Sequence, residues 1–412
     1  MRIADCRSSL LLFLAVAGPG LVVMLADTDA GSVIVAAQSG AVWGYRLLAL
    51  QLVLIPILFI AQELTVRLGI TTGMGHGELI KRHFGKIWAW VSVSTLLLSC
   101  IGAIITELSG LAAVGAMFGI PMGLSVGVVV LFLIVIAWSG SYLSVERIAM
   151  LIGAFELIFL YVAWDAHPAA SELIHGFLSI PWNNHAYLYM AAANIGAVIM
   201  PWMVFYQQSA VVDKGLKPQH LRAARLDTAI GAIITQLVMS AVLIATAATI
   251  GKTHPNASLD TVQQISDSLI PSLGTHVGRV LFALGLSGAA LVAAIVVSLT
   301  AAWGLGEVIG YRRSLSDRPK EAPWFYTIYS VVLILGGIVV ASGVNLVTLS
   351  VAVEVMNALL LPIVLGFLFF LAKKALPEAY RLQGYYIWMA AITLAVTALF
   401  GLYAGVVGSF SP

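Results

Sequence analysis

The chain has 412 residues, of which 60% are hydrophobic and only 10% are charged. Soluble domains carry roughly 25% charged residues, so this composition leaves too few charges to solvate a globule of this length. The net charge of +2 is too small to indicate a nucleic-acid partner. The two cysteines, Cys6 and Cys100, form neither a metal-ligand spacing nor a disulfide framework. These features predict an all-α integral membrane protein whose main solvent is the lipid bilayer.

Apolar stretches predict where the chain crosses the membrane, because a helix needs about 20 apolar residues to span the hydrocarbon core. They predict eleven spans: 10–37, 45–66, 87–116, 121–140, 147–165, 187–211, 226–250, 278–304, 323–342, 345–371 and 385–408. Arg2 and Arg7 precede the first stretch, as basic residues precede a secretory signal. In that stretch no cleavage site is followed by a polar mature region, and the apolar run continues. We therefore expect the first helix to be retained.

Basic residues predict the orientation of the spans, because cytoplasmic loops of membrane proteins are enriched in lysine and arginine. With the N-terminus in the cytoplasm, only Arg46, Lys252 and Arg279 fall on the external side, and the other 18 of the 21 basic residues fall inside. A miscounted span would mix the two sets. The asymmetry therefore favours eleven spans, with the C-terminus outside the plasma membrane, taken as a bacterial inner membrane.

Two spans are interrupted by residues that do not favour a continuous helix. The first contains residues 27–32 (DTDAGS), and the sixth contains Met200, Pro201 and Trp202. Asp and Thr compete for backbone hydrogen bonds, Gly lowers helix stability, and Pro lacks an amide donor. The second interruption lies five spans after the first, and this odd offset means that the two broken helices run in opposite directions. Corresponding breaks in two antiparallel halves are typical of an inverted-repeat transporter with a site near the middle of the bilayer.

The domain organisation follows from this repeat. We predict a single membrane transport domain over residues 1–412, with one repeat at about 10–165, a second at about 187–371 and an additional helix at about 385–408. The polar loops are short and contain no catalytic-looking cluster, so no separate soluble domain is expected.

Asp29 is the strongest candidate for substrate binding. A carboxylate at the depth of the hydrocarbon core costs several kcal/mol unless a partner or water compensates it. Asp29 lies in the predicted break, where free carbonyls such as that of Ala26 add oxygen ligands suited to a divalent cation. The alternative is that Asp29 only caps the half-helix that begins near Ala30. Asp27, two residues away, is either the cap or a second carboxylate beside the site.

Three further residues lie at the breaks. The Ser32 hydroxyl is either a weak oxygen ligand or a small residue that lets helices approach. The Met200 thioether is a soft ligand that favours transition metals, although methionine is more often an apolar filler. Ala197, one turn before Met200, offers only its carbonyl.

Other carboxylates fall at membrane depth and predict an ion or proton path. Glu107 and Glu354 are candidates for this path, and Asn357 lies one turn from Glu354 on the same helix face. For Glu156 we favour a structural carboxylate paired with a hydroxyl or an arginine. Glu63 and Arg67, four residues apart in one helix, predict an intrahelical ion pair.

The positions of the histidines and the lack of catalytic motifs in the sequence argue against an enzyme. All eight histidines fall in loops or at predicted helix ends, so we expect no buried imidazole as a metal ligand or proton relay. No metalloprotease, nucleophile-elbow or phosphate-loop motif is present in the sequence. An enzyme or a sensor is therefore disfavoured, and no cofactor is expected.

Four short motifs follow one another along the chain: residues 18–20 (GPG), 29–32 (DAGS), 62–73 (QELTVRLGITTG) and 196–201 (GAVIMP). In sequence and order they resemble motifs of the natural resistance-associated macrophage protein (NRAMP) family of divalent metal transporters. The resemblance implies a LeuT-like inverted repeat of five plus five helices, with Asp29 and Met200 as side-chain metal ligands and Ala197 as a carbonyl ligand. The metal would be a transported substrate, and the resemblance leaves the oligomeric state open.

The sequence departs from the family pattern of Asp-Pro-Gly-Asn in span 1 and Met-Pro-His in span 6. Ala30 replaces the proline, Ser32 the asparagine and Trp202 the histidine. In span 3, Glu107 matches a family acid, but its companion one turn earlier is replaced by Ile104. Because the family's histidine and span 3 acids are associated with proton movement, these departures weaken the case for proton coupling.

Two functions remain open from the sequence. The favoured one is import of divalent metal, with Mn²⁺ or Fe²⁺ first because Met200 is retained, and Mg²⁺ a close second because Ser32 implies a wetter site. The alternative keeps the fold but transports an amino acid or an organic amine. Asp29 argues against the alternative because it would repel a substrate carboxylate.

Overall fold

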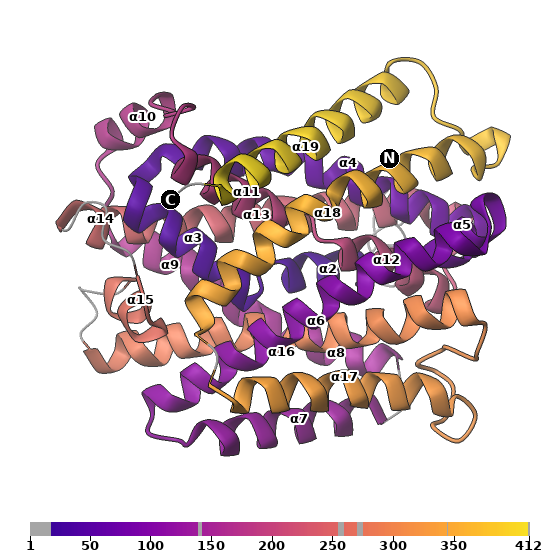
Figure 1. The fold of residues 1–412 in the computed structure, drawn as a ribbon, viewed down its shortest axis with the longest axis horizontal. Helices are drawn as coiled ribbons and strands as arrows, with labels where there is room; N and C mark the ends of the chain where they lie inside the picture. The colour runs from indigo at the N-terminus through magenta and orange to yellow at the C-terminus, as the bar shows by residue number, and fades with distance from the viewer. Residues whose placement is uncertain (1–17, 139–141, 254–258, 270–274, 344, 411–412) are drawn as a thin grey trace, which may run out of the picture.

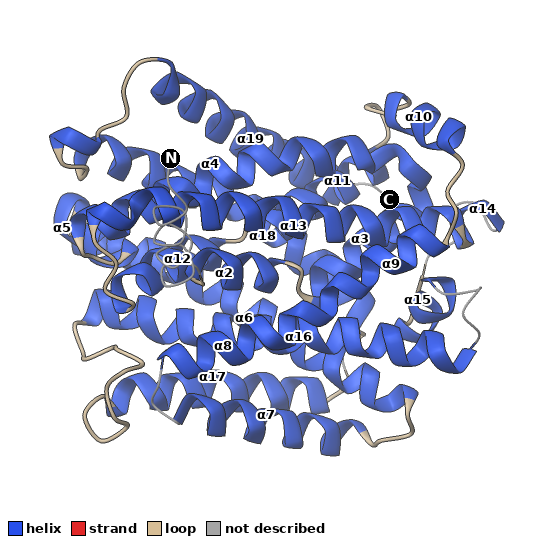
Figure 2. Ribbon diagram, turned by 180° about the vertical axis from the view of Figure 1, so that it is seen from behind, coloured by secondary structure: helices blue, strands red, loops and turns tan. Residues whose placement is uncertain are grey.

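The computed structural model contains helices and no strands across the residues that it describes, which are 18–138, 142–253, 259–269, 275–343 and 345–410 (Figure 1, Figure 2). The region predicted as the first repeat contains α2 (Pro19–Asp27), α3 (Ala30–Trp43), α4 (Leu48–Thr72), α6 (Lys86–Met117), α7 (Met122–Trp138), α8 (Tyr142–Gly153) and α9 (Ile158–Asp165). The region predicted as the second repeat contains α11 (His185–Val198), α12 (Pro201–Asp213), α13 (Leu221–Ala248), α16 (Thr275–Ile309), α17 (Pro323–Ala341) and α18 (Leu346–Lys374). The helix predicted as an addition corresponds to α19 (Tyr385–Ser409).

The predicted spans correspond to these helices within several residues at most boundaries. Nine segments of the described chain are long and apolar enough to cross a membrane; one of them, Ala30–Thr72, joins α3 to α4. Met122–Trp138 is a shorter apolar helix. The count of eleven spans therefore stays a prediction, and the start of the first span, including Arg2, Cys6 and Arg7, lies outside the described residues.

The outer helices expose large apolar side chains, as a lipid-solvated surface requires. α7 and α17 lie side by side at one edge of the molecule (Figure 1). Leu131 on α7 is 64% exposed, Ile338 on α17 is 62% exposed, and Leu399 on α19 is 64% exposed. Contiguous apolar surface of this kind is unfavourable in water and favourable against lipid tails.

Short helices gather at the two ends of the bundle. α10 (Ala170–Leu178), α14 (Ile250–Thr253) and α15 (Val262–Leu269) lie at one end, and α5 (His76–Phe84) lies at the other (Figure 1). α10 follows the fifth predicted span and α15 follows the seventh, so these two connections, both predicted to be external, share an end. Single turns of 3₁₀-helix complete the connections: η1 (Gly44–Leu47), η2 (Ala154–Leu157), η3 (Pro218–His220) and η4 (Glu378–Tyr380).

The broken helices lie at the centre of the bundle. α13 packs along both α2 and α3, and α11 packs against α18 and α19. Gly196 allows the contact between α11 and α18, because a Cβ there would lie 1.7 Å from the carbonyl oxygen of Glu354. Small residues at helix contacts permit this close approach of backbones. Packing therefore brings the start of α3 and the end of α11 to the same region.

Candidate functional site

The first break lies where it is predicted, between α2 and α3. α2 ends at Asp27, Thr28 follows in a non-helical conformation, and Asp29 is the N-cap of α3. The Asp29 carboxylate accepts a hydrogen bond from the amide of Ser32 through Oδ1, at 2.6 Å. Its second oxygen, Oδ2, is buried and has no hydrogen-bond partner among the described residues. Asp29 therefore caps the half-helix and still has an oxygen free for a ligand.

The second break lies between α11 and α12. α11 ends at Val198, Met200 is extended, and Pro201 is the first residue of α12. Met200 and Trp202 are both fully buried. The indole Nε1 of Trp202 donates a hydrogen bond to the Met200 sulfur at 3.1 Å. The thioether is thus placed in the break, but Trp202 already occupies one of its lone pairs.

The two breaks touch through Ser32 and Ala197. The Ser32 hydroxyl donates to the carbonyl oxygen of Ala197 at 2.9 Å. In a regular helix this carbonyl would accept from the residue four positions later, which is Pro201 and has no N–H. The proline therefore frees the Ala197 carbonyl, and its second lone pair is available to a ligand.

The carbonyl of Ala26 is freed in a similar way. Its regular helical partner would be the amide of Ala30. That amide instead donates to Glu107 Oε2 on α6, at 3.0 Å. Glu107 also accepts from the Thr106 hydroxyl at 3.3 Å, so it anchors the start of α3. Ile104, one turn earlier on α6, is a fully buried apolar side chain.

Glu354 and Asn357 of α18 also lie beside the first break. Asn357 donates to Glu354 Oε2 at 2.9 Å and accepts from the Ser99 hydroxyl at 2.7 Å. Glu354 Oε1 has no partner in the described part of the chain. A Cβ on Gly31 would lie 2.6 Å from this oxygen and 3.4 Å from Asp29 Oδ1. Gly31 therefore separates two buried carboxylates without adding a side chain between them.

Asp27 and Glu156 are two further buried acids beside the first break. Neither carboxylate oxygen of Asp27 has a partner among the described residues. Glu156 accepts a short hydrogen bond from the Thr28 hydroxyl, which agrees with the prediction that a hydroxyl satisfies it. Within the described residues, no three His, Cys, Asp or Glu side chains form a metal-binding group. A metal here would instead need one carboxylate together with sulfur, hydroxyl and carbonyl ligands.

The prediction that the chain contains no buried imidazole is wrong. His76 begins α5 but is fully buried, because its ring packs edge-on against Phe205 of α12 at a centroid distance of 4.8 Å. Its Nδ1 lies 3.1 Å from Gln208 Oε1. The flanking glycines, Gly75 and Gly77, are the signal in the sequence that this segment is closely packed. Both lie against the Glu307 carboxylate of α16.

Two other polar contacts extend beyond the sequence prediction. Glu63 and Arg67 form the predicted ion pair at 2.6 Å, and Glu63 also pairs with Arg225 of α13 at 3.1 Å. Asp227 was not among the predicted site residues. Its Oδ2 accepts from the amides of Gly18 and Gly20 at 3.2 and 2.7 Å, which ties α2 to α13.

Comparison with known proteins identifies the family. Residues 20–406 match the family model described as natural resistance-associated macrophage protein-like. A divalent metal cation transporter MntH of Staphylococcus aureus (strain JH9) is 30% identical over 245 residues, which are 56% of this chain and 54% of that protein. The chain thus spans about half the length of the curated relatives that it matches.

Solved structures agree on the fold. The Eremococcus coleocola manganese transporter, in complex with an aromatic bis-isothiourea substituted compound, has a TM-score of 0.75 at 20% identity and covers 97% of this chain and 88% of its own. MhsT in complex with L-phenylalanine has a TM-score of 0.64 at 14% identity and covers 95% and 98%. The predicted LeuT-like, all-α membrane fold is confirmed. With the family match over most of its length, this chain belongs to the NRAMP family.

Proposed function

We propose that this protein is a multi-pass secondary transporter that imports divalent metal ions by alternating access of its two repeats. The observation that carries the proposal is the unpartnered oxygen of Asp29, buried at one helix break that contacts the other break through Ser32 and Ala197. A buried carboxylate without a counterion is costly, and a bound cation compensates it. The relatives named above as divalent metal and manganese transporters support the same substrate class.

The proposed ligands come from both breaks. Asp29 Oδ2 supplies the charge, Met200 a soft sulfur, and Ser32 its hydroxyl. The carbonyls of Ala26 and Ala197 supply two more oxygens, each freed from its regular helical partner. Sulfur among oxygen ligands favours Mn²⁺ or Fe²⁺ over Mg²⁺. Mg²⁺ comes next in the proposal, because Trp202 already engages the sulfur.

Transport in this proposal is driven by the membrane potential. An inside-negative potential favours inward movement of a cation by about 2.3 kcal/mol per charge per 100 mV, so a divalent ion accumulates without a coupled proton. The carboxylates Asp27, Glu107 and Glu354, with Asn357, line the proposed ion path. The orientation is part of the proposal: the N-terminus lies in the cytoplasm and the C-terminus outside a bacterial plasma membrane.

An amino acid or organic amine is the alternative substrate on this fold. The likeness to MhsT concerns the fold and does not favour that substrate. A substrate carboxylate would meet Asp29 and, across Gly31, Glu354, and like charges in a buried site repel strongly. Isothermal titration separates the two: binding of an amino acid and of no metal would refute metal transport.

The proposed function is tested by measuring the uptake of Mn²⁺, Fe²⁺ and Mg²⁺ into liposomes that contain the purified protein. Asp29→Asn keeps the cap to the Ser32 amide but removes the charge, so we expect it to abolish uptake, with Glu378→Gln as the control at an exposed acid. Met200→Ala should lower uptake of Mn²⁺ more than that of Mg²⁺, with Met389→Ala as the lipid-facing control. Transport by Asp29→Asn at the wild-type rate would contradict the site. Acidification of the lumen in step with uptake would contradict the uncoupled mechanism.

A further inference from the structure

Glu307 is a buried carboxylate that joins three helices. It lies near the end of α16 and is 3% exposed. Its Oε1 accepts a hydrogen bond from the Ser209 hydroxyl of α12 at 2.6 Å, and its Oε2 accepts from the amide of Gly77 in α5 at 2.7 Å. No ion pair of the described residues includes Glu307. Neutral donors on two other helices therefore hold this carboxylate.

Two glycines allow α5 to approach Glu307. A Cβ on Gly75 would lie 1.9 Å from Glu307 Oε1, and a Cβ on Gly77 would lie 3.2 Å from Oε2. α5 and α16 both also pack against α6. These three helices form one block, and the bond from Ser209 to Glu307 ties α12 to that block.

The end of α12 has a second attachment. Asp213, the last residue of α12, accepts from the Ser314 hydroxyl at 2.6 Å and from the Leu315 amide at 3.3 Å. α12 has 13 residues and begins directly after Met200, so it is about 20 Å long. Ser209 and Asp213 lie in its last two turns. Both attachments therefore hold the end of the half-helix that is farthest from the proposed metal site.

A cavity beside these contacts gives the end of α12 room to move. It has a volume of about 260 Å³, and Ser209, Asp213, Glu307, Arg313 and Trp303 are among the residues that line it. The indole Nε1 of Trp303 is buried and has no partner within the described ranges. A polar cavity of this size holds water. If Glu307 released Ser209, it would find water and the Arg313 guanidinium in the same cavity.

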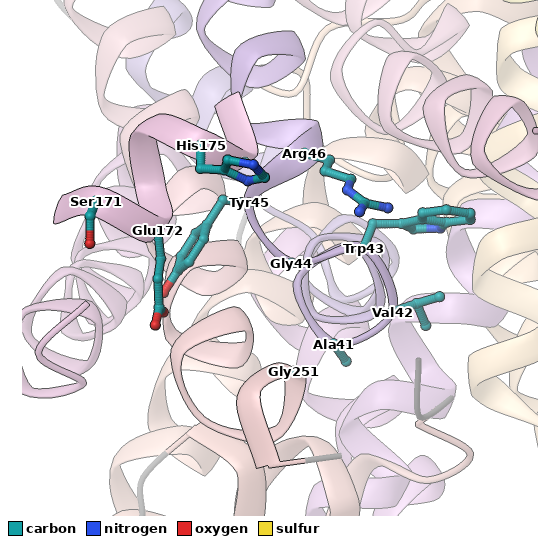
Figure 3. A pocket seen from close by; sticks show the side chains of 11 residues that line it. Ala41, Val42, Trp43, Gly44, Tyr45, Arg46, Ser171, Glu172, His175 and Gly251 are labelled. Carbon is teal, nitrogen blue, oxygen red and sulfur yellow. The ribbon is translucent and has the colours of Figure 1, made fainter. Parts of the chain in front are cut away.

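The opposite end of the bundle is joined without a buried acid. A cavity of about 390 Å³ lies there between the end of α3 and α10, and the Arg46 and Glu172 side chains that line it point apart (Figure 3). Glu172 pairs with Lys252 at 3.0 Å, but both side chains are about half exposed, and exposed pairs contribute little. The neutral Gln38 side chain holds α3 by pairing with the backbone of Leu259. No acid at this end of the described chain is buried.

We propose that Glu307 holds a cytoplasmic gate closed, and that α12 moves away from α5 and α16 only when Ser209 leaves this carboxylate. The inference rests on the transport function proposed above. α12 begins at the second break, so displacement of its far end opens a path from the breaks to the cytoplasm. Asp29 and Met200 are fully buried in this structure, which agrees with a gate that is closed while Glu307 keeps its bonds.

Spin labels on the full chain measure the position of α12 without any metal. The labels are placed at Lys217→Cys, just beyond α12, and at Lys86→Cys, at the start of α6; both positions are exposed. Cys6→Ser and Cys100→Ala remove the native thiols. Electron double resonance then gives the distribution of distances between the end of α12 and the block of α5, α6 and α16.

Glu307→Gln and Ser209→Ala should each raise the ratio of long to short distances by roughly tenfold, because each removes a hydrogen bond to a charged acceptor. Glu321→Gln is the matched control. That acid is exposed, and its Oε2 accepts only from the Arg318 amide of its own loop, so the distribution should not change. If Glu307→Gln does not fold, Ser209→Ala decides. An unchanged distribution in the folded variants would overturn the proposal.

A reversible cross-link tests whether transport needs this movement. Asp213→Cys and Ser314→Cys replace two side chains that are in contact, and a short thiol-reactive cross-linker joins them in the protein that lacks Cys6 and Cys100. Uptake of Mn²⁺ into liposomes should fall to background and return when a reductant cleaves the link. Uptake at the full rate with the link intact would overturn the proposal. Failure of wild type to transport any metal would instead refute the proposed function, and the metal-free distances would still decide the role of Glu307.

Discussion

Acidification is expected to weaken the contact between α5 and α12, because His76 must stay neutral where it is buried. Its ring lies against Phe205, its Nδ1 faces Gln208, and its Nε2 has no partner in the part of the chain that the structure describes. The helix α5 lies outside the candidate spans. Burial lowers the pKa of His76 from 6.5 to about 4, since no counter-charge compensates the protonated ring.

The size and sign of the effect follow from proton linkage. Between pH 6.5 and pH 4 the unfolded chain holds a proton on this histidine and the folded chain does not, so stability falls as the pH falls. One pKa unit corresponds to about 1.4 kcal/mol. At pH 5, which is about 1.5 units below the unfolded pKa, the folded state would lose about 2 kcal/mol relative to neutral pH.

The assay compares unfolding of wild type and His76→Asn at pH 7.5 and pH 5. Asparagine retains a donor toward Gln208 but does not titrate. Wild type should therefore lose about 2 kcal/mol more than the variant on acidification. His185→Asn, at an exposed histidine, should behave like wild type. An identical pH dependence of wild type and His76→Asn would refute the reasoning.

Three further substitutions test contacts around the breaks. Gly31→Ala places a Cβ 2.6 Å from Glu354 Oε1 and should therefore lower the stability of the protein by about 1–3 kcal/mol. Thermal unfolding measures this, and unchanged stability would contradict the close packing at Gly31. Trp202→Phe removes the hydrogen bond to the Met200 sulfur and should tighten Mn²⁺ binding by roughly fivefold, because a competing bond of about 1 kcal/mol is lost. Calorimetry measures the affinity, and weaker binding by the variant would contradict this expectation. Asp227→Asn removes the charged acceptor of the Gly18 and Gly20 amides and should lower the free energy of unfolding by about 1.5–3 kcal/mol. An unchanged free energy of unfolding would show that this anchor is dispensable.

The spans and the breaks could be predicted because their causes are local. Apolar length alone predicts helices such as α6 and α18, since lipid leaves a backbone few alternatives. The missing amide of Pro201 and the capping side chain of Asp29 interrupt their own helices, so each break is visible in the sequence. The prediction of Glu63 with Arg67 succeeded for the same reason, because both residues lie on one helix.

The contacts that escaped prediction join residues far apart in the chain. His76 is buried by α12, more than a hundred residues later. Its flanking glycines signal close packing, but they do not indicate which helix covers the ring. The bond from Asp227 to the start of α2 also depends on how α13 packs. The departure of Trp202 from the family pattern was visible, but its bond to the Met200 sulfur depends on a rotamer that the sequence does not specify.

Locating the bound ion tests the central proposal most directly. Anomalous diffraction from crystals of the full chain grown with Mn²⁺ would show where the metal lies. The account predicts one peak within about 2.6 Å of Asp29 Oδ2, in contact with the Met200 sulfur after Trp202 has released it. A peak at any other carboxylate, with Asp29 still bound only to the Ser32 amide, would contradict the account.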